Sequence, residues 1–599
     1  MRLHPSLLAF ALAIPAVAQS TPSTLPDLSA RLAAQNALFE EQYQSDLKLS
    51  PLRATAFGDL RYNAQLDDMS LAGSRLANAA NQRFLDRLNA IPTAGFSEKD
   101  QLSHNIMARQ LGNRTAEFAL KEFEMPVNQM SGIHTELADL PLEVPLDSVQ
   151  HYQDYIARLH QIPRAFDQTI EVLRAGVADH LLPVRFLLEK VPVQCDGIVA
   201  ANPFLIPTTR YPASISPKEQ KRLTAEINHA IQTEVLPAYS RFAAFIRTDY
   251  APLGRTALAI TSLPDGQKRY QFAINSRTTT HLSATEIHAI GLREITRIES
   301  EMTVLAKRAG FPDLASFRAS LKDNPKYMPA SSEQILDDYR RYLGQMQPKL
   351  PQLFTILPKA SVTVEAIPAF QAAMATHYMA GTPDGRRAGR IVVATADFKD
   401  RSLVDDEATA YHEGIPGHHL QVSIQQELTG VPTFQLHSHF TAYIEGWALY
   451  SEQLGKEVGF YQDPVSDYGR LSSELFRAVR LVVDTGIHNE GWSRDQVVDF
   501  FRKSGSAPEP EIQSETDRYI AWPAQALAYK LGQLKILELR EHARKELGSS
   551  FDLRRFHDQI LDAGALPLDL LEARIDHWMI TQKSTSATAR PTALRSGVQ

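Results

Sequence analysis

Apolar residues recur every three or four positions along most of the chain from about Leu28 onward, which is the period of an amphipathic α-helix. A capping serine followed three residues later by Glu or Gln marks three helix starts, at Ser216, Ser283 and Ser493. After Ser216 a proline takes the first helical position, and leucine and isoleucine then recur every four residues. These stripes predict helices that bury their apolar faces against one another and form a scaffold.

Strand patterns are few. Residues 361–365 alternate between polar and apolar side chains, and residues 390–395 are rich in β-branched residues after a Gly-Thr-Pro-Asp-Gly turn at 381–385. The predicted fold class is therefore mainly α, a large helical body with a small β-sheet.

The length of the chain predicts more than one lobe, because 599 residues exceed what one compact core normally holds. We place an N-terminal helical lobe at residues 19–325 and a C-terminal lobe at residues 326–583, divided near an Asp-Asn-Pro sequence. Residues 584–599 are rich in Ser, Thr, Ala and Arg, a composition that predicts a disordered tail.

The first 18 residues have the three parts of a signal peptide. Arg2 gives a positive start, residues 7–13 are apolar, and Ala16-Val17-Ala18 is a small-x-small cleavage site. The apolar run is too short to span a bilayer, and no cysteine follows it that could carry a lipid anchor. We expect an exported protein, periplasmic or extracellular, that is soluble and unanchored after cleavage.

Composition narrows the possible partners and sites. Hydrophobic residues make up 44 % of the chain, charged residues 22 %, and the net charge is -7, which is ordinary for a globular protein. No basic patch stands out, which argues against nucleic acid as a partner. Cys195 is the only cysteine, so an intramolecular disulfide and a cysteine-based zinc site are excluded.

The candidate chemistry lies in the sequence Tyr-His-Glu-Gly-Ile-Pro-Gly-His-His at residues 411–419. Neutral imidazoles can hold a zinc ion, and Glu413 beside His412 could take a proton from a water molecule on the metal. The usual motif places two histidines four residues apart on one helical face. Here the second histidine comes six or seven residues after His412, so on an ideal helix His412 and His418 would point about 120° apart.

Helix-breaking residues between the histidines explain how one ion could still be held. Gly414, Pro416 and Gly417 interrupt the helix, and we expect a bulge that brings His418 to the position of the second ligand. His419 is the alternative.

A third ligand is expected on the next carboxylate-bearing helix, with a fourth position left for water. Glu445 lies 27 residues after His418, a spacing that suits a helix, a turn and a second, antiparallel helix. Glu452 lies two turns further on the same face and is either a replacement ligand or a group that orients one. The acids at residues 405–407 complement the helix dipole rather than bind metal.

The sequences HEGIPGHHLQ and EGWALYSE resemble those of a bacterial family catalogued as domain of unknown function 885. Further similar segments are residues 278–291, 480–488, 518–532 and 564–568, so the resemblance covers roughly residues 50–580. It implies a gluzincin-like zinc metallopeptidase fold, distantly similar to the Taq-type carboxypeptidases. In such folds a strand placed like residues 390–395 lies along the cleft, and its edge can bind an extended peptide.

The resemblance also supplies candidates for the remaining roles, because they lie in its downstream segments. Tyr519 is the first choice for the donor that stabilises the developing oxyanion, followed by His488, with Arg518 and Tyr529 as further candidates. Asp484 could orient a ligand histidine, and Arg480 or Arg518 could bind a substrate carboxylate.

The sequence thus predicts an exported Zn²⁺-dependent hydrolase that cuts peptide bonds, with short peptides as substrates. The metal ligands are His412, His418 and Glu445, and Glu413 is the general base. Two other functions stay open: hydrolysis of a non-peptide amide or ester, and a binding protein that keeps the fold without turnover.

Overall fold

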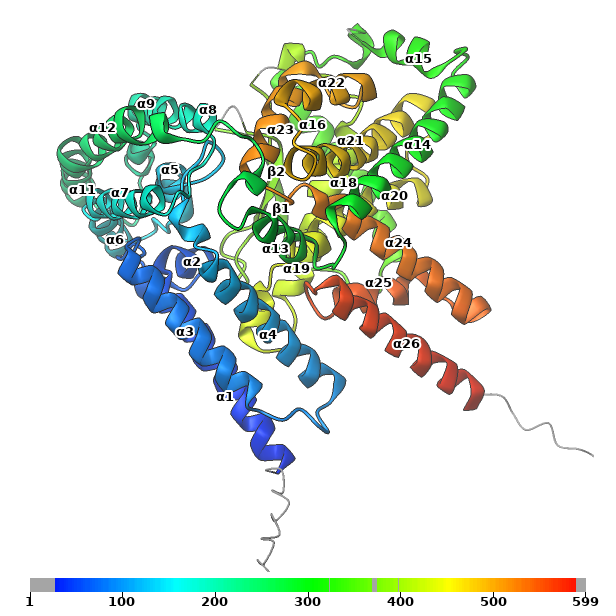
Figure 1. Cartoon of the computed structure of the whole chain (residues 1–599), viewed down its shortest axis with the longest axis horizontal. Coiled ribbons are helices and arrows are strands. Elements are labelled where there is room, and N and C mark those ends of the chain that lie inside the picture. The colour runs from blue at the N-terminus through cyan, green and yellow to red at the C-terminus, as the bar shows by residue number, and fades with distance from the viewer. Residues whose placement is uncertain (1–26, 323, 369–373, 397, 589–599) are drawn as a thin grey trace, which may run out of the picture.

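The computed structural model describes residues 27–322, 324–368, 374–396 and 398–588, so the predicted signal peptide lies outside the described residues. The fold is mainly helical with one small sheet, as the sequence predicts. The first group of helices is α1 (Leu28–Leu49), α2 (Pro51–Ala56), α3 (Leu71–Asn89) and α4 (Glu98–Ala119). These run beside one another at the lower left of Figure 1.

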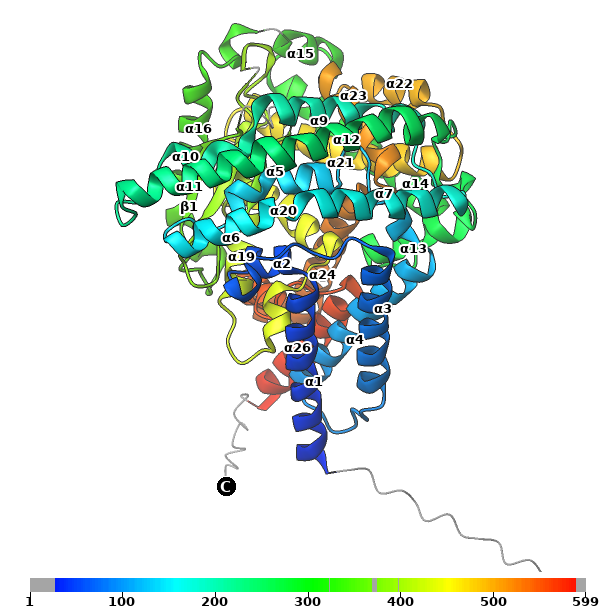
Figure 2. The same ribbon diagram turned by 90° about the vertical axis from the view of Figure 1, so that its left-hand side faces the viewer.

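The next helices form a compact body of their own. They are α5 (Ile133–Glu143), α6 (Val149–Leu159), α7 (Ile162–Ala178), α8 (Arg185–Leu188), α9 (Lys190–Ala201), α10 (Ile206–Thr209), α11 (Pro217–Ala230) and α12 (Leu236–Phe245). Their apolar residues make a separate core that extends from Leu66 to Ala251. Figure 2 faces this body and shows α7, α11 and α12 in front of the C-terminal helices.

The remaining helices make up the rest of the molecule. They are α13 (Gly266–Thr278), α14 (Ala284–Arg308), α15 (Leu314–Leu321), α16 (Ser332–Met346), α17 (Leu350–Leu353), α18 (Asp406–Glu413), α19 (His418–Gln426), α20 (Thr441–Glu457), α21 (Pro464–His488), α22 (Arg494–Ser504), α23 (Glu509–Ala521), α24 (Leu527–Leu547), α25 (Leu553–Leu561) and α26 (Leu568–Thr588). The predicted caps hold: Ser216, Ser283 and Ser493 each accept a hydrogen bond from the backbone N–H three residues later.

The largest core does not follow the lobe boundary predicted at residue 325. It joins apolar side chains of α1, α3 and α4 to those of α16, α18, α19, α20, α24, α25 and α26. The division into 19–325 and 326–583 therefore does not separate two cores, because the N-terminal helices pack on the C-terminal half. Helix α26 also continues to Thr588, past the start predicted for the tail, and the residues after it lie outside the described ones.

The sheet has three strands, β1 (Val362–Ala366), β2 (His377–Met379) and β3 (Gly389–Val393), in the order β1-β3-β2. β3 pairs in parallel with β1 and in antiparallel fashion with β2. The expectation that this strand offers a free edge to a peptide is therefore wrong, because both of its edges are already hydrogen-bonded.

Two glycines allow α20 and α24 to cross at very close range. A Cβ atom on Gly446 would meet the backbone of Gly532, and one on Gly532 would collide with the carbonyl oxygen of Ala442. This crossing sets Glu445 on α20 against the start of α24. Within the described part of the chain, no helix combines the length and apolarity needed to cross a membrane.

Candidate metal centre

The helix that carries His412 stops one residue after it, and a new helix starts at His418. Between α18 and α19 the chain makes a tight turn, in which Gly417 N–H donates to the Tyr411 carbonyl at 3.0 Å and His419 N–H to that of Gly414 at 3.1 Å. A side chain on Gly417 would collide with the carbonyl oxygens of Tyr411 and His412. The glycine and proline residues thus break the helix completely, where the sequence predicts a bulge within it.

This break brings the three predicted ligands together. Glu445 Oε2 lies 3.3 Å from His418 Nε2 and 3.6 Å from His412 Nε2. The two imidazole rings are perpendicular, with centroids 4.8 Å apart. One ligand atom from each residue lies within 4.8 Å of the others, so the group could hold one metal ion. Two histidines and a carboxylate are a typical donor set of catalytic zinc sites.

Glu452 orients His412 from behind. Its Oε1 lies 2.8 Å from His412 Nδ1, and both side chains are 2 % exposed. Contact with Nδ1 leaves Nε2 of the same ring directed at the ligand group. Burial lowers the pKa of His412, but the carboxylates of Glu445 and Glu452 outweigh it and raise that pKa to about 9. The pair of carboxylates around one ring therefore favours a cation at this position.

His419 lies on the other side of α19 and contacts the sheet. Its Nδ1 is 3.2 Å from the Tyr378 hydroxyl, and its Nε2 is 3.2 Å from the carbonyl oxygen of Ala360. Of the two histidines that the sequence leaves open, His418 joins the ligand group and His419 does not.

Glu413 follows His412 directly at the end of α18. It is 8 % exposed, and its carboxylate makes no hydrogen bond or ion pair with any residue in the described part of the chain. Its carboxylate oxygens are therefore available to accept hydrogen bonds from a water molecule or a substrate.

Tyr529, at the start of α24, is the tyrosine next to the ligand group. Its ring lies parallel to that of His412, with centroids 6.4 Å apart. Its hydroxyl accepts a hydrogen bond from Arg518 Nη2 at 3.0 Å, so the hydroxyl proton remains available to another acceptor.

The hydroxyl of Tyr519 is already engaged by other residues of the protein. It donates to Glu515 at 2.5 Å and accepts from Arg480 Nε at 2.9 Å, and the residue is fully buried. Both arginines proposed for substrate binding also pair with Glu515, Arg480 at 2.9 Å and Arg518 at 3.0 Å. Both guanidinium groups are thus already paired with a carboxylate of the protein. Arg480 also stacks on Tyr529, with 4.6 Å between the guanidinium carbon and the ring centre.

His488 and Asp484 lie in another buried region, beside α13. Both ring nitrogens of His488 are used by the backbone: Nδ1 accepts from Ile260 N–H at 3.1 Å, and Nε2 lies 2.9 Å from the Tyr519 carbonyl. Asp484 accepts hydrogen bonds from the Tyr270 hydroxyl at 2.6 Å and from Ala524 N–H. Glu452, and not Asp484, therefore orients a ligand histidine.

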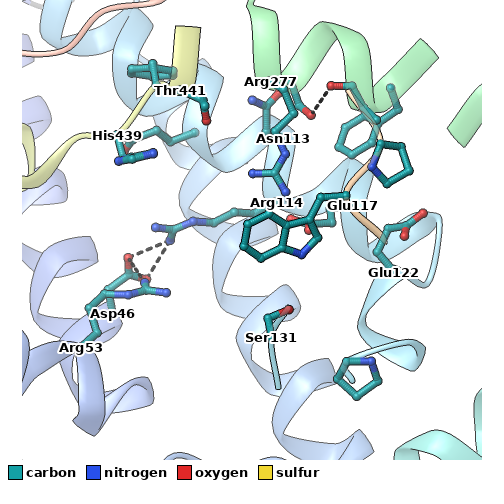
Figure 3. A pocket seen from close by; sticks show the side chains of 18 of the residues that line it. Asp46, Arg53, Asn113, Arg114, Glu117, Glu122, Ser131, Arg277, His439 and Thr441 are labelled. Atoms are coloured by element: carbon teal, nitrogen blue, oxygen red, sulfur yellow. Dashed lines mark hydrogen bonds and ion pairs between the residues drawn. The ribbon is translucent and has the colours of Figure 1, made fainter. Parts of the chain in front are cut away.

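A pocket of about 730 Å³ lies between α1, α2 and α4 on one side and α13 and the start of α20 on the other. It adjoins the ligand group, because Thr441 in its wall is one helical turn before Glu445 on α20. His439, also in the wall, is close enough to Glu445 and His418 to interact with them electrostatically. Figure 3 shows Thr441 and His439 next to each other in this wall.

Sequence reasoning missed His439 and Arg277, which both line this pocket. A signal was present for one of them: Arg277 comes directly before the three threonines that belong to the family-like segments. His439 lies between the two motifs and carries no such signal.

Comparison with known proteins places the chain in a family. The family described as "Bacterial protein of unknown function (DUF885)" matches residues 51–575. The structure is similar to that of a "putative lipoprotein" from Colwellia psychrerythraea, with a TM-score of 0.87, 28 % identity, and coverage of 92 % of this chain and 100 % of that one.

A "putative lipoprotein of unknown function" from Shewanella oneidensis shares the fold at a TM-score of 0.69 and 17 % identity, over 90 % of this chain and 99 % of that one. No curated protein matches the chain. Since the family match covers most of the sequence, this protein belongs to the DUF885 family of bacterial proteins.

Proposed function

We propose that this protein is a zinc-dependent peptidase. The observation that carries the proposal is the combination of His412, His418 and Glu445 around one point with Glu413 beside them and Glu452 behind His412. A structural site would close all four positions of the metal, whereas three ligands next to a free carboxylate are typical of zinc hydrolases. A bound zinc ion would polarise the substrate carbonyl and lower the pKa of water.

The chain's own groups can perform the proton transfers. Glu413 accepts the proton of the attacking water and passes it to the leaving amine, which a carboxylate without a protein partner can do. Tyr529 donates a hydrogen bond from its hydroxyl group to the oxyanion that develops on the substrate, while Arg518 donates one to the hydroxyl oxygen. Tyr529 takes this role in place of Tyr519, whose hydroxyl proton is bound by Glu515.

Two further observations support a peptide substrate and an exported protein. The pocket next to the ligand group is lined by several helices and by both charged and aromatic side chains, which suits a peptide with polar backbone groups and varied side chains. The two similar structures are of proteins described as lipoproteins, and the sequence begins with the pattern of a signal peptide. We infer export to the periplasm or the cell exterior.

The substitution Glu413→Gln tests the proposal. Zinc-loaded protein would be incubated with a peptide library, and the products would be read by mass spectrometry. We expect turnover to fall by at least about 100-fold, with the zinc content unchanged. Glu538→Gln, an exposed surface change on α24, is the matched control and should leave turnover intact. Full activity of the Glu413→Gln protein would contradict the mechanism.

A further inference from the structure

We propose that Arg277 binds the C-terminal carboxylate of the peptide, so that the enzyme cuts near free C-termini. This inference rests on the proposed peptidase function and names its substrate class. Arg277 lies in the last turn of α13 and lines the pocket next to the ligand group.

The pocket contains one more positive charge than negative charge. Four arginines line it, together with three carboxylates. These residues are Arg53, Arg114, Arg269, Arg277, Asp46, Glu117 and Glu122. The surplus favours an anionic ligand, since charges inside a low-dielectric cleft are weakly screened.

Three of the four arginines are already paired with carboxylates of the protein. Arg114 holds both oxygens of Asp46, at 2.7 and 3.0 Å, and Arg53 lies 3.8 Å from the same carboxylate. Arg269 pairs with Glu122 at 2.5 Å and donates to a backbone carbonyl. In Figure 3 dashed lines join Asp46 to its arginines on one side of the pocket.

Arg277 differs from these three. It is exposed and makes no hydrogen bond or ion pair with any residue that the structure describes. Asn113, on the facing helix α4, lies near Arg277 in Figure 3 and likewise makes no side-chain hydrogen bond within the described residues. A guanidinium and an amide N–H₂ together can bind a carboxylate through several charge-assisted hydrogen bonds.

The end of α13 holds Arg277 in place. The hydroxyl of Thr278 donates to the Ile274 carbonyl at 2.7 Å, and the hydroxyl oxygen of Thr279 accepts from Leu568 N–H at 2.9 Å. Thr279 ends the helix in the left-handed region at φ 53°. These contacts fix the backbone next to Arg277, which lowers the entropy cost of binding.

The lining of the pocket connects Arg277 to the ligand group. His439 and Thr441 line the same pocket as Arg277, and Thr441 lies one helical turn before Glu445 on α20. A peptide with its terminal carboxylate on Arg277 would therefore extend toward the metal centre, and the bond that is cut would lie close to its C-terminus.

Binding and turnover are tested separately. The inactive Glu413→Gln protein, loaded with zinc, is titrated calorimetrically with N-acetylated tetra-alanine that ends in a free acid or an amide. We expect the acid to bind at least about 10-fold more tightly than the amide. Addition of Arg277→Gln should abolish this preference, while Arg293→Gln, which removes an exposed arginine of α14 outside the pocket lining, should retain it.

Equal affinity for acid and amide, no binding of the acid, or a preference that survives Arg277→Gln would overturn the inference. Turnover of the same peptides by the parent enzyme reports on the proposed function alone. If the acid binds through Arg277 and the parent enzyme cuts neither peptide, the peptidase proposal fails while the carboxylate site stands.

Discussion

At the scale of single residues, the hydroxyl groups of two tyrosines differ in whether they can donate a hydrogen bond to a substrate. The Tyr519 hydroxyl donates its hydrogen bond to Glu515 and is fully buried, so it cannot donate one to a substrate. Tyr529 has its oxygen held by Arg518 and its ring beside His412. A donor that is fixed in advance is worth most where charge develops in the transition state.

Tyr529→Phe is therefore expected to lower kcat by about 100-fold with a smaller change in KM, because it removes a donor that acts in the transition state. Tyr519→Phe is the matched control and should reduce the stability of the protein more than its kcat. Steady-state kinetics on one peptide would decide this. A large loss of kcat in Tyr519→Phe with normal Tyr529→Phe kinetics would reverse the assignment.

At the scale of elements, the crossing of α20 and α24 positions both sides of the site. Glu445 lies directly before Gly446, and Tyr529 lies one turn before Gly532 on the facing helix. Backbone contact at these glycines keeps the ligand carboxylate and the tyrosine at a fixed separation, as small residues allow where helices approach closely.

Gly532→Ala should push the two helices apart, because its Cβ atom would collide with the Ala442 carbonyl. We expect a loss of about 1–3 kcal/mol of unfolding free energy and weaker zinc binding, both measurable by urea titration with and without zinc. Gly344→Ala on α16, where a Cβ atom meets nothing within 4 Å, should be neutral or stabilising. An unchanged midpoint for Gly532→Ala would show that the crossing is not tight.

Local patterns were sufficient to predict the capped helices, two of the three strands and the grouping of His412, His418 and Glu445, since caps, alternation and the histidine spacing are local signals. They could not show that β3 lies between β1 and β2, because strand order depends on pairing between distant segments. The sequence also could not decide between Tyr519 and Tyr529, because both lie in the family-like segment 518–532. Only packing shows that the ring of Tyr529 stacks against His412.

At the scale of the whole molecule, the site lies where separate parts of the fold meet. One wall of the pocket comes from α1, α2 and α4, and the other from α13 and α20. The N-terminal helices therefore line this pocket as well as contribute to the core. The interior of the molecule also holds several buried ionisable groups.

One of these groups makes stability depend on pH. Burial lowers the pKa of His488 to about 3, whereas a histidine in an unfolded chain titrates near pH 6.5. Between these values the unfolded state binds a proton that the folded state does not, so His488 destabilises the fold as pH falls through this window. Burial raises the pKa of the neighbouring Asp484 to about 7, which acts in the opposite direction.

The comparison must therefore be made between variant and parent. On going from pH 7.5 to 5.5, His488→Gln should lose less unfolding free energy than the parent, by about 1.4 kcal/mol. His542→Gln, a change at a half-exposed histidine, should follow the parent. Urea unfolding at the two pH values gives the numbers, and identical pH dependence of parent and His488→Gln would contradict the buried, neutral state of His488.

The central claim is that His412, His418 and Glu445 hold one zinc ion. Elemental analysis of the purified protein after zinc supplementation and dialysis tests it most directly, with His418→Ala and His419→Ala measured in parallel. We predict about one zinc per chain, lost in His418→Ala and kept in His419→Ala, since His419 contacts the sheet. No zinc in the parent protein, or zinc lost only in His419→Ala, would contradict the account.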